Sequence, residues 1–105
     1  MTTRKSARFK VPINLFIDNV LCPIADLSLT GVGVTFTAPI PEIGSEITIT
    51  MVFPHKTGQE GWEVRATVAR FDERKKTLGL LFAEDEEFKA FLLEFLGHMR
   101  DEGLI

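Results

Sequence analysis

Two short groups of residues have the types and spacing of the two halves of a binding site. Arg4 and Arg8 stand four residues apart in RKSAR, and Asp26, Ser28 and Gly31 follow in DLSLTG, eighteen residues after Arg8. A guanidinium group is a planar cation that forks onto phosphate oxygens. A carboxylate accepts hydrogen bonds, a hydroxyl donates or accepts them, and a glycine lets a ligand approach the backbone closely.

Each group alone also has a simpler interpretation. Two basic residues near a terminus are commonly a solvated charged tail. An Asp-x-Ser segment between strands is commonly a turn whose side chains bond the local backbone, and Gly31 would then supply a positive φ. Residue types alone leave both interpretations open.

The charge distribution favours a small anionic ligand over a nucleic acid. The net charge is −3, and residues 84–105 hold seven of the fifteen acidic residues. Residues 1–10 hold four basic residues and no acidic one. The N-terminal segment could therefore receive an anion, although the whole chain would repel DNA or RNA.

Length and composition indicate one soluble domain. A chain of 105 residues has room for one core, and its 45% hydrophobic and 26% charged residues are typical of a globular protein. No apolar run reaches the length of a membrane span, so we expect no membrane insertion. Cys22 is the only cysteine, which suits a reducing compartment. These features predict a cytoplasmic protein.

No group of residues has the arrangement of a catalytic or metal site. His55 and His98 have no partner at metal-ligand spacing, and Cys22 is interpreted as a small strand residue. There is no phosphate-cradling glycine loop, Ser-His-Asp order or pair of acids. We therefore expect no metal, no cofactor and no enzymatic activity.

Hydrophobic periodicity predicts a β-barrel or sandwich over residues 10–83. Apolar residues alternate with polar ones in the segment that ends at Ile17 and, most clearly, in SEITITMVF. Six extended runs follow one another with no helix between them, which favours an antiparallel arrangement. The other four runs are VLCPIAD, GVGVTFT, WEVRATVARF and LGLLF.

The periodicity changes at Glu84 and predicts a helix over residues 84–100. Six large apolar residues recur there at spacings of three and four, which places them on one helical face. They are Phe88, Phe91, Leu92, Phe95, Leu96 and Met99. The acidic residues 84–87 fall where the first turn should be and complement the helix dipole. We expect the apolar face to dock on the sheet or on a partner.

The two polar groups, in this order and between these strands, resemble the signature of the PilZ domain family, RxxxR followed by D/N-x-S-x-x-G. RKSAR and DLSLTG match it at every defined position, and RFKVPINL and LGLLF also look like family segments. The resemblance covers roughly residues 4–97. It implies a mainly β fold, a six-stranded antiparallel β-barrel with a C-terminal α-helix, and binding of the bacterial second messenger cyclic di-GMP.

The resemblance also assigns residues to the ligand. It implies that Arg4, Arg8, Asp26, Ser28 and Gly31 bind cyclic di-GMP. Beside these motif residues we expect Lys5 to be an extra phosphate contact. Some family members carry a further arginine just before the motif, which helps to hold a stacked ligand dimer. Thr3 stands in that place here. We therefore expect one cyclic di-GMP per domain.

These inferences predict a single PilZ-like domain over residues 1–105 that acts as a noncatalytic receptor in signal transduction. Residues 1–9 are expected to be a flexible segment that orders over the ligand and presents a changed surface to a protein partner. The alternative is a PilZ-like structural or interaction module that binds no nucleotide. If the chain is complete it is a stand-alone receiver, and if it is part of a longer protein its output domain lies elsewhere.

Overall fold

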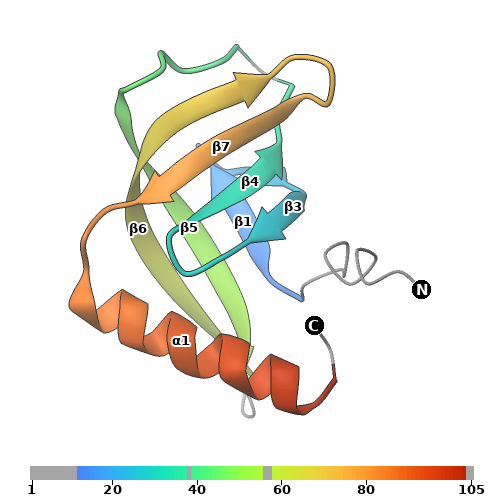
Figure 1. Ribbon diagram of the computed structural model, residues 1–105, viewed down its shortest axis with the longest axis vertical. Coiled ribbons are helices and arrows are strands. Elements are labelled where there is room, and N and C mark those ends of the chain that lie inside the picture. The colour runs from blue at the N-terminus through green and yellow to red at the C-terminus, as the bar shows by residue number, and fades with distance from the viewer. Residues whose placement is uncertain (1–11, 38, 56–57, 104–105) are drawn as a thin grey trace.

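The structure is a computed structural model that describes residues 12–37, 39–55 and 58–103. These residues form one antiparallel sheet and one helix (Figure 1). Arg4, Lys5 and Arg8, and with them the expected flexible segment 1–9, lie outside the described residues. The elements are β1 (Asn14–Ile17), β2 (Val20–Cys22), β3 (Ile24–Leu27), β4 (Gly31–Thr35), β5 (Glu46–His55), β6 (Gly58–Asp72), β7 (Thr77–Phe82) and α1 (Glu86–Asp101).

The sheet curls into a nearly closed barrel of seven strands. Its order is β2-β1-β5-β6-β7-β4-β3, so the two edge strands are consecutive in the chain and are joined at Pro23. The Thr35 N–H donates to the Pro23 carbonyl oxygen at 2.8 Å, which ties β4 to this junction. The predicted barrel is confirmed, with seven strands where six were expected. VLCPIAD forms two strands because proline has a fixed φ and no N–H to donate to a ladder.

The barrel interior is built from the alternating residues that the sequence singles out. Strand β5 supplies Ile49, Met51 and Phe53, all fully buried, and the facing strands supply inward valines and leucines. The β1–β2 hairpin has a two-residue loop, Asp18-Asn19, with φ of 51° and 65°. Positive φ at both loop residues matches the twist of the flanking strands, and Asp and Asn tolerate it well.

Helix α1 covers one end of the barrel (Figure 1). Asp85 caps it, because its carboxylate accepts a hydrogen bond from the Phe88 N–H at 3.0 Å, and Glu86 and Glu87 occupy the first turn. The apolar face of the helix docks on the barrel. Of the two predicted docking surfaces, the sheet and a partner, the structure shows the sheet. Phe53 of β5 lies with its ring centroid 4.8 Å from Phe91 and 5.0 Å from Phe95.

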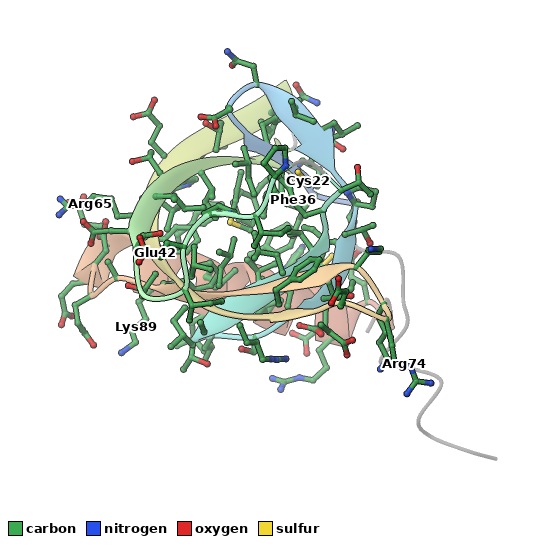
Figure 2. The ribbon with its side chains drawn as sticks, turned by 90° about the horizontal axis from the view of Figure 1, so that it is seen from above. Cys22, Phe36, Glu42, Arg65, Arg74 and Lys89 are labelled. Carbon is green, nitrogen blue, oxygen red and sulfur yellow. The ribbon has the colours of Figure 1, made fainter. Side chains whose placement is uncertain are left out.

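Viewed from above, the strands enclose a ring filled with side chains (Figure 2). Cys22 and Phe36 belong to this core, whereas Arg65 and Arg74 project outside it. Burial raises the pKa of the Cys22 thiol, an effect that a backbone hydrogen bond at Ile17 partly opposes. The thiol is therefore poorly suited to act as a nucleophile, as the sequence interpretation predicts.

Two kinds of feature are absent from the described part of the chain. No helix there is long and apolar enough to span a bilayer. The same residues contain no group of three or more His, Cys, Asp or Glu side chains placed to hold a metal ion.

Candidate functional site

A shallow groove on the outer face of the barrel brings together the described half of the predicted site. It lies over β3, β4, β7 and β6 and has a volume of about 210 Å³. Asp26, Ser28 and Gly31 all line it, although they are separated along the chain by a strand end and a turn. Arg70 and Gly79, which the sequence did not single out, line it as well. In Figure 1 this face is formed by the adjacent ribbons of β3, β4 and β7.

Ser28 builds the turn between β3 and β4. Its hydroxyl oxygen accepts hydrogen bonds from the N–H groups of Thr30 and Gly31 at 3.2 and 3.3 Å. The Ser28 N–H in turn donates to the Gly31 carbonyl oxygen at 2.9 Å. The simpler interpretation of Ser28 as a turn residue is thus correct, and the turn directly follows β3, which carries Asp26.

Gly31 is required for a reason that differs from the simpler interpretation. Its φ is not positive, because the glycines with positive φ among the described residues are Gly44, Gly58 and Gly103. A Cβ at Gly31 would instead overlap the backbone carbonyl oxygen of Leu80 on the neighbouring strand β7. The glycine therefore permits β4 and β7 to pack closely beside the groove.

Replacing Gly31 with alanine should therefore destabilise the fold. Because the obstacle is backbone, β4 and β7 would have to separate locally, at a cost of about 1–3 kcal/mol, typical of overpacking. Urea unfolding of Gly31→Ala measures this cost. Gly61→Ala is the matched control, since nothing lies within 4 Å of a Cβ placed at Gly61. Equal stability of Gly31→Ala and the wild-type protein would contradict the close approach at Leu80.

A row of four residues crosses the floor of the groove. Strand pairing places Asp26 opposite Gly33, Gly33 opposite Gly79, and Gly79 opposite Arg70. The two glycines carry no side chains of their own, and the side chains of Asp26 and Arg70 lean over them from the two ends of the row. Within the described residues neither charged side chain has a hydrogen-bond or ion-pair partner, and both are exposed.

Arg70 is the residue that sequence reasoning missed. Alternation along WEVRATVARF places Arg65 and Thr67 outside, and continued regularly it would put Ala69 outside and Arg70 inside. The pairing register instead shifts between Val68 and Arg70. One feature of the sequence could have revealed the outward direction of Arg70. Regular alternation would bury its charged side chain inside a small barrel, which is energetically unfavourable.

Comparison with known proteins identifies the family. The model of the PilZ domain matches residues 2–96, so the chain belongs to the PilZ family. This confirms the resemblance and places the chain in a family of cyclic di-GMP-binding modules. A search of curated proteins finds no match. The chain is also similar to the crystal structure of an uncharacterised protein of Legionella, with a TM-score of 0.68 and 23% sequence identity over 87% of this chain and 88% of that one. That likeness supports the fold alone.

Proposed function

We propose that this domain is a noncatalytic receptor for cyclic di-GMP. The observation that carries the proposal is the position of Asp26, Ser28 and Gly31, which line one groove on the barrel surface. In a member of this family, that groove is where the second half of the RxxxR and D/N-x-S-x-x-G signature would meet a ligand. Arg4 and Arg8 would complete the site from the N-terminal segment, with Lys5 as an extra phosphate contact.

The residue types fit the chemistry of the ligand. Cyclic di-GMP carries two phosphates and two guanines, and an arginine can fork onto phosphate oxygens or onto guanine O6 and N7. The Asp26 carboxylate accepts from the guanine N1–H and N2 amino groups. Asp26 has no hydrogen-bond partner within the described residues, so its carboxylate would lose no protein contact there on binding.

The proposed signal is ordering of the N-terminal segment. Residues 1–9 carry three like charges, at Arg4, Lys5 and Arg8, and an anionic ligand would neutralise them. Ordering costs roughly 1–2 kcal/mol of backbone entropy per residue, which the arginine contacts must offset. The ordered segment would present a surface to a protein partner or output domain in the cytoplasm.

Calorimetric titration of the purified protein with cyclic di-GMP tests the proposal. We expect saturable binding with one ligand per domain, because Thr3 stands where a further arginine would help to hold a stacked ligand dimer. The competing function is a PilZ-like interaction module that binds no nucleotide and assembles with a partner through the barrel or the helix. Absence of binding up to millimolar cyclic di-GMP would favour that second function.

A further inference from the structure

We infer that Arg70 reads a nucleobase in the proposed site and, together with Asp26, selects guanine over adenine. The inference rests on the proposed function, since it concerns the same ligand and the same groove. It adds a residue from β6, far from the signature in sequence, and it assigns that residue a role in base specificity.

The first observation is the floor between the two charged side chains. Four adjacent strands each contribute one residue to this row: Asp26 on β3, Gly33 on β4, Gly79 on β7 and Arg70 on β6. Adjacent strands lie about 4.8 Å apart, so the two ends of the row are separated by roughly 14 Å at the backbone. The two central positions carry no side chain. The glycines leave room for the Asp26 and Arg70 side chains to lean over them, so a base held in the groove would lie above this layer with a hydrogen-bonding group at either side.

The second observation is that a β-bulge aims each of the two charged side chains. On β3 the register shifts between Ile24 and Asp26, so Ala25 is an extra residue. On β6 it shifts between Val68 and Arg70, so Ala69 is an extra residue. With regular pairing Asp26 would stand opposite Val32 and Arg70 opposite Leu78, both of which point into the core.

The bulges thus turn a carboxylate and a guanidinium from the core to the same outer row. Bulges are common next to functional sites, where they redirect a side chain. Here a bulge lies at each end of one row, and each bulge places a charged residue opposite a glycine. This arrangement is the one expected where bulges direct side chains toward a binding site.

The third observation is that both side chains lie over the glycines. The Asp26 oxygens Oδ1 and Oδ2 lie 3.0 and 3.1 Å from the point where a Cβ of Gly33 would be. Arg70 approaches the corresponding point at Gly79 with Cγ at 3.0 Å and with Nε and Nη1 at 3.4 Å. Their polar groups therefore occupy the layer directly above the glycines, where they can contact a base held in the groove.

The chemistry of this pair matches guanine and not adenine. Guanine offers donors at N1 and N2, which a carboxylate accepts, and acceptors at O6 and N7, onto which an arginine forks. Adenine would present the N1 lone pair to the Asp26 carboxylate and the N6 amino group to the Arg70 guanidinium. Both contacts are then unpaired or repulsive, which is how a site discriminates against a wrong ligand.

The test compares cyclic di-GMP with cyclic di-AMP as ligands of variant proteins. We expect Arg70→Ala to weaken cyclic di-GMP binding about tenfold to hundredfold, the effect of losing one bidentate base contact. The affinity for cyclic di-AMP should fall much less. The ratio of the affinity for cyclic di-GMP to that for cyclic di-AMP should therefore be smaller in Arg70→Ala than in the wild-type protein. Arg70→Lys should bind cyclic di-GMP little better than Arg70→Ala, because lysine keeps the charge but lacks the planar fork of donors.

Arg74→Ala is the matched control. Arg74 lies in the exposed turn after β6, outside the residues that line the groove, and projects away from the barrel (Figure 2). Removing its charge should change the affinity by less than about twofold, because exposed charges at a distance are screened by salt. Thermal unfolding of each variant verifies that the barrel remains intact, as expected for substitutions of exposed side chains.

Two results would overturn the inference while leaving the proposed function in place. Wild-type affinity in Arg70→Ala, with binding lost in Asp26→Ala, would remove Arg70 from the site. Equal losses for both cyclic dinucleotides would show that Arg70 supplies charge without reading the base. Failure of the wild-type protein to bind cyclic di-GMP would instead refute the proposed function, and this inference with it.

Discussion

Asp26→Ala and Arg8→Ala should each weaken cyclic di-GMP binding about tenfold to hundredfold while the barrel stays folded. Each substitution removes one charged hydrogen-bonding partner of the ligand, which is worth roughly 1.5–3 kcal/mol. Asp26 is exposed in β3, and Arg8, which lies outside the described residues, precedes the first alternating run of the sequence, so neither substitution removes a predicted core residue. Calorimetric titration of both variants beside the wild-type protein measures the loss.

Glu63→Ala provides the matched control for Asp26. Glu63 is also an exposed carboxylate on the sheet, but it lies outside the groove, opposite Thr50 on β5. Its replacement changes the net charge by the same amount and should leave the affinity within about twofold, because distant exposed charges are screened. Wild-type affinity in both Asp26→Ala and Arg8→Ala would remove these residues from the site.

Phe53→Ala should have the largest effect on stability and should loosen the helix from the barrel. Phe53 is fully buried, and its ring packs against Phe88, Phe91 and Phe95 of α1. Truncating a buried phenylalanine costs about 3–5 kcal/mol, a large part of the 5–15 kcal/mol by which domains are usually stable. Denaturant unfolding, monitored by tryptophan fluorescence and circular dichroism, gives the loss.

Trp62 makes the fluorescence readout specific for this contact. Its ring lies 5.4 Å from that of Phe88 and 5.0 Å from that of Phe91, so separation of α1 changes its surroundings. Leu93→Ala is the control, because Leu93 lies on the same helix with 57% of its surface exposed. If Phe53→Ala lowered the free energy of unfolding no more than Leu93→Ala, α1 would not pack on the end of the barrel through Phe53.

Features that depend on local rules were predictable from the sequence. The alternation in SEITITMVF identified the buried side of β5, because side chains of a strand point alternately to its two faces. The spacing of apolar residues after Glu84 identified α1 and its docking face, and the acidic run placed its start two residues early, since the helix begins at Glu86 after the N-cap Asp85. The family signature likewise consists of short fixed spacings, which a single sequence displays.

Features that depend on strand pairing were not predictable. The extra residues Ala25 and Ala69 are recognised only from the partners opposite them, so the outward direction of Arg70 was missed. The need for glycine at position 31 comes from the Leu80 carbonyl, which is 49 positions away in the chain. Both effects arise from contacts between distant segments, about which periodicity carries no information.

Amide hydrogen exchange with and without cyclic di-GMP tests most directly that the ligand binds between the N-terminal arginines and the groove. We predict that residues 3–9 and the β3–β4 turn gain protection on binding, while residues 46–53 of β5, on another part of the barrel, change little. Protection of the turn alone would refute closure by the arginine segment. Unchanged exchange in both segments at saturating ligand would contradict the proposed site itself.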